Sequence, residues 1–569
     1  MKILQQHVDF IEYEPIAKEI KSAEEAEKKK VRYDDILVLF TTIENGDTND
    51  TARMAIDDVQ KFLKNLGKNT ILIYPFAHLS SNLARPLDAL GILDAMEARA
   101  KELGITTHRS PFGWNKQYSL KIKAHPLAEQ SRSYSPSTTA KNASKKVDSA
   151  KTSAQADLTI VKKSNWSGLP ETDHRTIGEK LDLYSFQEVS PGMTYWHPKG
   201  YVVYKELMRF IRQKLDQYGY QEIATPAFAN LALWEVSGHS DHYKENMYTF
   251  SSENQVFGLK PMNCPSTILI FNSRKWSYKD LPVRLADFDK LYRNEVSGSL
   301  TGLFRVRELT QDDAHLFVRD DQVEAELVML LKMISEMYQV FGLEYTAKLS
   351  TMPDSHLGDE ALWTRAIDAL KAGLNANKMK FEVKEKEGAF YGPKIDFDIK
   401  DSMGRAWQCA TVQLDYQLPK RFGLEYTGED GKQHTPVIIH RVIYGSLERF
   451  IAVLTEHYQG KFPTWLAPVQ TRVISISEGA NEYAREVHKK LKDSGIRSEC
   501  DDSNKTLEYK IREAQLMKVP YMLIVGGKEV EAKTVAVRAR SGGQKFGVKI
   551  EDFIEKMKVE VENKAPSPN

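Results

Sequence analysis

Side chains that could bind anions or metal ions are concentrated between Arg284 and Phe317, in RLADFDKLYRNEVSGSLTGLFRVRELTQDDAHLF. Two strand-like arms flank a Gly/Ser-rich loop at residues 296–302, which predicts a hairpin. Because strand side chains alternate between faces, we expect one polar face. It would hold Asp287, Asp289, Arg293 and Glu295 from the first arm, and Arg305, Arg307, Gln311, Asp313 and His315 from the second. Arginines suit bidentate capture of phosphate or carboxylate, whereas a solvated sheet face is the alternative interpretation.

Three widely separated residues have side chains of the types that bind metal ions. Cys264 lies in LKPMNCP, His315 in TQDDAHLF and His440 in PVIIHRVIYGSLERF. A thiolate and two imidazoles suit Zn²⁺ and leave one coordination position open. No local ligand spacing joins them, however, and a buried cysteine is more often structural, so these residues alone do not predict a metal site.

Two helices are expected to support this chemistry. A helix over residues 200–218 ends at Gly219 and leads into the strand QEIATPAF, which ends at Pro226. A second helix opens at GSLERF, with Arg449 in its first turn, where backbone N–H groups favour anions. From sequence alone, the first helix could be an amphipathic helix that packs within its own domain.

Length and composition limit the protein class. The 569 residues suggest three or four domains. A net charge of +1 gives no overall basic field for nucleic acid, so any RNA contact must use local patches. Three cysteines without paired spacing suit a reducing compartment. The first residues lack a leader pattern and no 18-residue apolar stretch occurs, so we expect a cytoplasmic protein without membrane association.

Composition divides the chain into four parts. Residues 1–130 alternate strand and helix patterns, with strands at 1–7, 35–42, 70–76 and 114–124 and helices at 51–65 and 86–103. Residues 131–168 are rich in Ser, Thr, Ala and Lys, which predicts a flexible linker. Residues 169–465 form the candidate catalytic domain, and residues 466–569 return to a regular α/β pattern.

The hairpin segment resembles motif 2 of class II aminoacyl-tRNA synthetases in its threonyl-tRNA synthetase form, on YRNE followed by SGSLTGLFRVRELTQDDAHLF. The helix before Pro226 is similar to motif 1, and GSLERF to motif 3. The resemblance implies an α+β multidomain protein whose 169–465 core is built on an antiparallel sheet. It also implies a homodimer formed through motif 1, and the substrates L-threonine, ATP with Mg²⁺, and tRNA(Thr).

The resemblance assigns roles within that core. Arg293 would bridge the α-phosphate and the threonine carboxylate, Glu295 would meet adenine, and Arg305 and Arg449 would clamp the distal phosphates. Substrate contacts are implied for Gln311, Asp313, Tyr391, Lys394, Gln408, Gln413 and Ser446. His239, in VSGHSDHY, matches a histidine that would assist transfer to tRNA. Cys264, His315 and His440 match zinc ligands that separate threonine from isosteric valine.

The N-terminal part is similar to the editing domain of archaeal threonyl-tRNA synthetases, on VDFIEYEP, YPFAHLSS and PFGWNKQYSLKIKAHPLAE. This implies hydrolysis of mischarged seryl-tRNA(Thr), with His78 and Lys116 in the pocket and Glu129 in a supporting role. Asn115 stands where that family often has an aromatic residue. A second hydrolytic site is physically reasonable, because a pocket distinguishes substrates that differ by one methyl only about 10–200-fold.

The C-terminal part resembles the anticodon-binding domain of class II synthetases, on KIREAQLMKVPYMLIVGGKEVEAKTVAVRAR. Asn504, Arg512, Glu529 and Arg538 match positions that contact the anticodon, and such side chains supply the directional groups that base edges need.

Two alternatives for the whole chain are a non-catalytic tRNA-binding paralogue and a synthetase for another amino acid. The retention of Arg293, Arg449, Cys264, His315 and His440 argues against the first, and the Cys-His-His set with Asp313 argues against the second.

Overall fold

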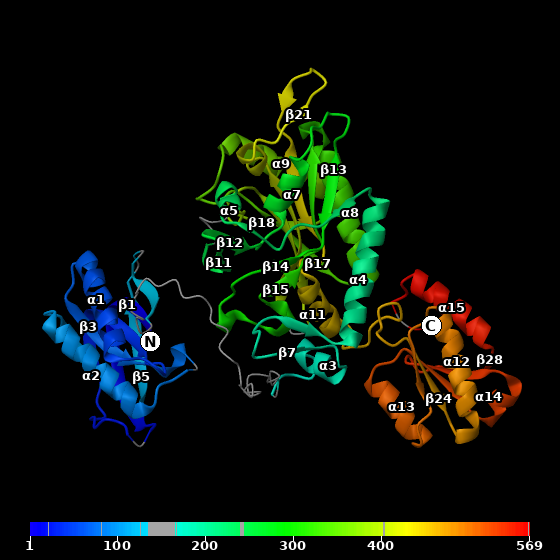
Figure 1. The fold of residues 1–569 in the computed structure, drawn as a ribbon, viewed down its shortest axis with the longest axis horizontal. Helices are drawn as coiled ribbons and strands as arrows, with labels where there is room; N and C mark the ends of the chain where they lie inside the picture. Colours follow the sequence, from blue (N-terminus) through cyan, green and yellow to red (C-terminus); the bar gives the residue numbers. More distant parts are fainter. Residues whose placement is uncertain are drawn as a thin grey trace. The chain divides into compact units, whose positions relative to one another are not determined.

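The computed structural model describes residues 1–20, 22–80, 82–123, 125, 127–134, 166, 168–238, 244–401, 404–566 and 568. It divides into two compact units, residues 1–153 and 154–569 (Figure 1). The predicted linker at 131–168 lies almost entirely outside the described residues. None of the helices in the described ranges has the length and apolar character that crossing a membrane requires.

The first unit is a sheet with two helices on one face. Its strands run in the order β4-β3-β2-β1-β5, with β6 also paired to β1. The strand bounds are β1 (Lys2–Lys18), β2 (Val31–Thr42), β3 (Thr70–Pro75), β4 (Thr106–Arg109), β5 (Trp114–Ile122) and β6 (Glu129–Ser133). The helices are α1 (Asn49–Leu66) and α2 (Pro86–Glu102), and a short 3-10 turn, η1, spans Ala77–Leu79.

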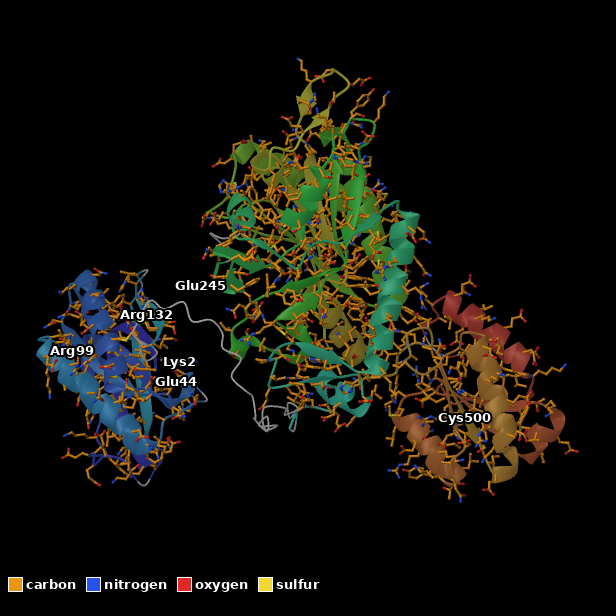
Figure 2. All side chains as sticks on the ribbon, viewed as in Figure 1. Lys2, Glu44, Arg99, Arg132, Glu245 and Cys500 are labelled. Atoms are coloured by element: carbon orange, nitrogen blue, oxygen red, sulfur yellow. The ribbon has the colours of Figure 1, made fainter. Side chains whose placement is uncertain are left out.

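Alternation along β2 separates two cores in this unit. Leu37 and Leu39 face the helices, and Val38 and Phe40 join an aromatic-rich cluster with Tyr74 on the other face. The chain start is held by ion pairs from the Met1 amino group to Glu44 and Asp47; Lys2 and Glu44 are marked in Figure 2. β1 is much longer than the predicted strand at 1–7, because it pairs with β2 and then β5 along most of its length.

The second unit contains an eight-stranded sheet in the order β18-β17-β19-β20-β23-β16-β13-β9, antiparallel except at β17–β18 and β13–β9. The bounds in that order are Phe381–Lys384, Tyr345–Ser350, Lys394–Lys400, Ala406–Asp415, Val437–Val442, Asp313–Val318, Val283–Asp287 and Gln221–Ile223. The largely antiparallel sheet agrees with the core that the resemblance implies.

The main helices cover one face of this sheet, and the site lies on the other face. The main helices are α4 (Pro198–Gln217), α8 (Val323–Phe341), α9 (Glu360–Ala376) and α11 (Leu447–His457), and their buried residues share one core with the strands. α3 (His174–Lys180) contacts α11, and α7 (Cys264–Phe271) belongs to a second cluster with Phe317 and Ile438. α4 agrees with the helix predicted at 200–218.

Shorter strands complete the core. Two pairs are β7 (Tyr184–Phe186) with β8 (Thr194–Trp196), and β21 (Tyr426–Thr427) with β22 (Gln433–His434). A three-stranded sheet contains β10 (Phe228–Asn230), β12 (Gln255–Leu259) and β11 (Thr249–Ser252). Short helices are α5 (Ala232–Val236) and α10 (Leu418–Arg421).

Residues after 470 form a five-stranded sheet ordered β25-β24-β26-β27-β28. The strands are β24 (Thr471–Ser475), β25 (Ser498–Asp501), β26 (Tyr521–Val525), β27 (Val535–Ala539) and β28 (Gln544–Val548). The helices are α12 (Asn481–Asp493), α13 (Leu507–Leu516), α14 (Gly527–Ala532) and α15 (Ile550–Glu562). α12 and α15 share one core, and α13 packs with Met522 and Ile474 in another, so the sheet is covered on both faces.

Candidate active site

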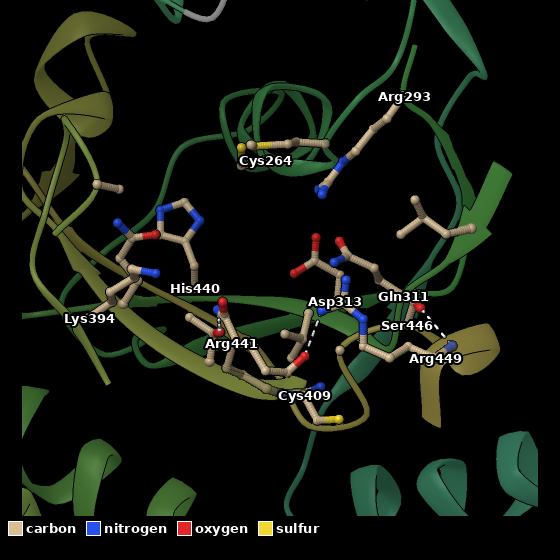
Figure 3. Close-up of a pocket in the computed structure, with 18 of the residues that line it drawn as sticks. Cys264, Arg293, Gln311, Asp313, Lys394, Cys409, His440, Arg441, Ser446 and Arg449 are labelled. Atoms are coloured by element: carbon tan, nitrogen blue, oxygen red, sulfur yellow. Dashed lines mark hydrogen bonds between the residues drawn. The ribbon is translucent and has the colours of Figure 1, made fainter. Parts of the chain in front are cut away.

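A cavity of about 490 Å³ opens on the face of the large sheet opposite the main helices, beside the start of α7 (Figure 3). Fourteen of the fifteen side chains that the sequence analysis assigns to this site, ligands included, line it. They are Cys264, Arg293, Glu295, Arg305, Gln311, Asp313, His315, Tyr391, Lys394, Gln408, Gln413, His440, Ser446 and Arg449. The remaining one, His239, lies outside the described residues.

Strand register aligns four of these side chains in one row. Lys394 on β19 pairs with Gln413 on β20, Gln413 pairs with His440 on β23, and His440 pairs with His315 on β16. Directly opposed residues in antiparallel strands point to the same face. Residues distant in sequence are therefore brought together by backbone pairing alone.

The three candidate metal ligands meet at the end of this row. Donor atoms of Cys264, His315 and His440 all lie within 4.8 Å of one another, and all three residues are buried. α7 begins at Cys264 and carries its thiol to the two imidazoles, whose ring centroids are 4.9 Å apart. This cluster satisfies the distance requirement that sequence spacing could not test.

The surroundings of the cluster fit a bound Zn²⁺. His440 Nε2 lies 3.0 Å from a carboxylate oxygen of buried Asp415, an arrangement that orients metal-binding histidines. His315 Nδ1 is buried and has no hydrogen-bond partner among the described residues. Burial and the neighbouring His440 and Arg441 hold the pKa of His315 well below its usual range, so its ring is neutral. One cysteine sulfur and two imidazoles are a zinc donor set.

A cluster of arginines lies elsewhere in the cavity. Arg449 Nε donates to the Phe304 carbonyl at 3.1 Å and its Nη1 donates to the Gln408 carbonyl at 2.7 Å. Ser446 caps α11 by accepting the Arg449 backbone N–H at 3.1 Å. Burial, together with the nearby cations of Arg293 and Arg305, lowers the pKa of Arg449. This concentration of positive charge favours a polyanionic ligand such as a triphosphate.

Polar partners fix the other lining residues. Arg293 Nε donates to the Pro261 carbonyl at 3.2 Å, and Arg305 Nε lies 3.3 Å from a Glu295 carboxylate oxygen. Gln413 donates to the Gly392 carbonyl at 3.0 Å. These contacts hold the side chains in place before any ligand binds, which reduces the ordering cost of binding.

Sequence reasoning missed three polar partners of site residues: Asn263 beside Asp313, Asp396 beside Lys394, and Asp415 beside His440. Asp313 accepts from Asn263 Nδ2 at 3.2 Å, and its pKa is raised by burial. Lys394 pairs with Asp396 at 2.6 Å. Asp396 lies two residues after Lys394 on β19, and Asp415 lies two residues after Gln413 on β20. Because side chains two apart on a strand share a face, this spacing could have placed both carboxylates at the site.

The predicted hairpin exists but is not continuous. β13 pairs with β16 in the large sheet, whereas β14 (Lys290–Tyr292) and β15 (Glu308–Thr310) form a separate two-stranded piece. The single polar face predicted over both arms is therefore wrong in part. Asp289 turns to Thr225 and Lys260, and Arg307 Nε donates to the Glu295 carbonyl.

A second cavity, of about 370 Å³, lies in the first unit. His78, Lys116 and Asn115 line it together with Tyr74 and Thr42. Burial lowers the pKa of Lys116 to about 8, and its ammonium donates to the Pro111 carbonyl at 2.7 Å. Glu129 is not brought to this cavity; it lies on β6, where its carboxylate accepts from Gln6 at 2.6 Å.

The predicted anticodon residues are spread over the C-terminal sheet and its helices. Asn504 precedes α13 and Arg512 lies on it, both exposed. Arg538 pairs with Met522, whose side chain packs with α13, so Arg538 shares the α13 face of the sheet. Glu529 lies on α14 and accepts the Gly526 N–H at 3.0 Å. Three of the four residues therefore lie on or beside one helix.

Comparison with known proteins identifies the family. Residues 1–134 match the archaea-specific editing domain of threonyl-tRNA synthetase, residues 248–458 the class II tRNA synthetase core domain (G, H, P, S and T), and residues 470–560 an anticodon binding domain. A crystal structure of the RNA binding domain of threonyl-tRNA synthetase from Cryptosporidium parvum Iowa II is 43% identical, with a TM-score of 0.67. The match covers 68% of this chain and 98% of that one. The chain belongs to the threonyl-tRNA synthetase family.

Other relatives extend this result. The threonine–tRNA ligase of Caldanaerobacter subterraneus subsp. tengcongensis is 51% identical over 393 residues, which are 69% of this chain and 61% of that protein. The chain thus spans less than two thirds of the length of this relative. A putative threonyl-tRNA synthetase from Aeropyrum pernix is 28% identical, with a TM-score of 0.61, over 70% of this chain and 98% of that one.

Asp415 provides a direct test of the ligand cluster. We predict that Asp415→Ala weakens zinc binding by about 10–100-fold, because His440 loses the carboxylate that orients its ring. Competition with a chromophoric chelator measures this affinity. The matched control is Cys500→Ser, which removes a thiol distant from the cluster in sequence and should leave the affinity unchanged. Wild-type affinity in Asp415→Ala would contradict the assignment.

Proposed function

We propose that this chain is a threonine–tRNA ligase: it activates L-threonine with ATP and transfers it to tRNA(Thr), and its first unit hydrolyses seryl-tRNA(Thr). One observation carries this proposal: a single cavity holds both the Cys264, His315 and His440 cluster and three arginines. The first group suits an amino acid with a hydroxyl, and the second suits a triphosphate. The proposed domains are 1–130 for editing, 169–465 for catalysis and 466–569 for the anticodon, joined by a 131–168 linker.

Activation requires positioning and charge stabilisation by the protein. The threonine carboxylate is itself the nucleophile and pyrophosphate is the leaving group, so this step needs no protein nucleophile. Arg293 would neutralise charge that develops on the α-phosphate, while Arg305 and Arg449 hold the distal phosphates with Mg²⁺. Glu295 would accept from adenine. The placement of the three guanidinium groups in one cavity supports the roles proposed for the arginines.

Amino-acid selection would depend on the other half of the cavity. Zinc held by Cys264, His315 and His440 would supply a Lewis-acidic position that accepts an amine and a hydroxyl but not a methyl group. Asp313 and Gln311 would orient the same polar groups, with Tyr391 and Gln413 beside them. Lys394, Gln408 and Ser446 complete the proposed substrate contacts.

Transfer, partners and assembly complete the proposal. His239 would assist deprotonation of the tRNA ribose, because an imidazole is an effective base near neutral pH. Asn504, Arg512, Glu529 and Arg538 would read the anticodon. α4 and the β9 segment would form a homodimer interface, as in the motif 1 resemblance. The proposed location is the cytoplasm, which suits all of these substrates.

ATP–pyrophosphate exchange tests the main activity. Exchange should depend on threonine, be weak with serine, be absent with valine, and be lost when zinc is removed by a chelator. Arg293→Ala should lower kcat/KM by about 100-fold or more, because it removes charge stabilisation in the transition state. The control is Arg365→Ala, which changes an exposed arginine on α9 that pairs with Asp320. Valine-dependent exchange equal to that with threonine would reject the proposed specificity.

The editing cavity makes a pH prediction. Since the pKa of Lys116 is lowered to about 8, its neutral amine becomes the main form above that pH and can act as a base. Hydrolysis of seryl-tRNA(Thr) should rise with pH and level off above about 8. Lys116→Ala and Lys116→Arg should both slow it by about 100-fold or more, because a guanidinium remains charged.

Lys121→Ala is the matched control for Lys116, because Lys121 lies on the same strand, is exposed, and pairs with Asp9. Its rate and pH profile should match those of the wild type. Unchanged seryl-tRNA hydrolysis by Lys116→Ala, measured with preformed seryl-tRNA(Thr), would remove Lys116 from the site. Full activity in Lys116→Arg would show that its positive charge, not its base strength, is what matters.

A further inference from the structure

A buried cluster of Asp173, His174 and Glu456 lies outside the cavity residues described above. Their donor atoms also lie within 4.8 Å of one another. Unlike the zinc-type cluster, however, this one has both imidazole nitrogens engaged. His174 Nδ1 lies 2.9 Å from a Glu456 carboxylate oxygen, and His174 Nε2 accepts the Leu303 backbone N–H at 3.1 Å. It is therefore a hydrogen-bonded bridge rather than a metal site.

The direction of these two bonds defines the state of the ring. Nε2 accepts a hydrogen bond, so it carries no proton, and Nδ1 carries the hydrogen that is donated to Glu456. Burial lowers the pKa of His174 and thereby favours this neutral form. The bridge joins α11, which carries Glu456 and Arg449, to the loop between the two hairpin arms, which carries Leu303.

The loop residue next to Leu303 contacts the phosphate-binding arginine. The Phe304 carbonyl accepts from Arg449 Nε at 3.1 Å. The Phe304 ring stacks on Trp407 with centroids 4.1 Å apart, and its edge meets His174 at 4.5 Å. Two contacts therefore connect the imidazole to the peptide that fixes Arg449: one through the Leu303 N–H and one through the Phe304 ring.

Gly302 shows how closely the loop approaches the ring. Its φ is +51°, in the left-handed region, and a Cβ placed there would lie 2.4 Å from His174 Nε2. Any side chain at this position would separate the imidazole from the Leu303 N–H. The close approach indicates that the loop is fitted to the histidine.

We propose that His174 is a positioning residue for ATP binding: through the Leu303 N–H it holds the Phe304 carbonyl where it orients the Arg449 guanidinium. This inference rests on the proposed function only in taking the ligand of Arg449 to be ATP. His174 touches no reacting atom. It acts by keeping the hairpin loop and α11 in one fixed arrangement, which spares the arginine an ordering cost when the triphosphate binds.

Two substitutions of His174 separate its two hydrogen bonds. In His174→Asn the short amide can donate to Glu456, as Nδ1 does, but cannot reach Leu303. In His174→Gln the longer side chain brings an amide oxygen to the position of Nε2, so it can accept from Leu303. His457→Asn is the matched control, since His457 is the exposed histidine next to Glu456 on α11.

Calorimetric titration with Mg·ATP, without amino acid, is the primary measurement on the full chain. We expect His174→Asn to weaken ATP binding about tenfold, as for loss of one buried hydrogen bond, and His174→Gln and His457→Asn to stay within about twofold of wild type. In pyrophosphate exchange, the KM for ATP should rise in parallel while the KM for threonine stays unchanged. A general structural defect would instead reduce the active fraction without changing the affinity for ATP.

Wild-type ATP affinity in His174→Asn would overturn the proposal, and so would equal weakening in the Asn and Gln variants. If His174→Asn does not fold, the Gly302→Ala variant provides the test, because its added methyl pushes the loop away from the His174 ring. Unchanged ATP affinity in Gly302→Ala would also overturn the proposal. The ATP titration needs no threonine, so it tests the role of His174 even if threonine-dependent pyrophosphate exchange is absent. Absence of threonine-dependent exchange by the wild type would reject the proposed function instead.

Discussion

The backbone register of four central strands is the constraint on which the site depends. Lys394, Gln413, His440 and His315 form one row only because β19, β20, β23 and β16 pair in this register. A slip of one residue would turn each side chain to the helix-covered face. That face is filled by α8, α11 and their neighbours, so the apolar residues between the functional ones fix the register.

Buried carboxylates on both faces of the large sheet are stabilised by hydrogen-bond and ion-pair partners. On the cavity side, Asp415 supports His440 and also accepts the Gln417 and Leu418 N–H groups. On the helix side, Asp312 accepts the Ile443 and Tyr444 N–H groups and lies beside Arg441. Unpaired buried charge would be costly, so these partners are what allow the strands to carry a polar site. Asp312 and Asp313, adjacent in sequence, thus serve opposite faces.

The sequence predicted much of this because local patterns and a long family resemblance agreed. The predicted helix at 200–218 and the helix start at GSLERF follow from local sequence, and the residues assigned to the cavity around Arg293 follow from the family resemblance. Convergence of Cys264 with His315 and His440 could not follow from spacing, since only tertiary pairing joins them. The break in the hairpin was missed because alternation was extended across Asp289, which turns to Lys260. His174 was missed because its partners, Leu303 and Glu456, lie over a hundred residues away.

Zinc K-edge X-ray absorption of the full chain is the most direct test of the central claim, which is that one thiolate and two imidazoles from three separate segments hold one ion. The account predicts a first shell with one sulfur at about 2.3 Å and two imidazole nitrogens at about 2.0–2.1 Å. The sulfur contribution should vanish in Cys264→Ser. A purified chain without stoichiometric zinc, or a shell that contains no sulfur, would contradict the account.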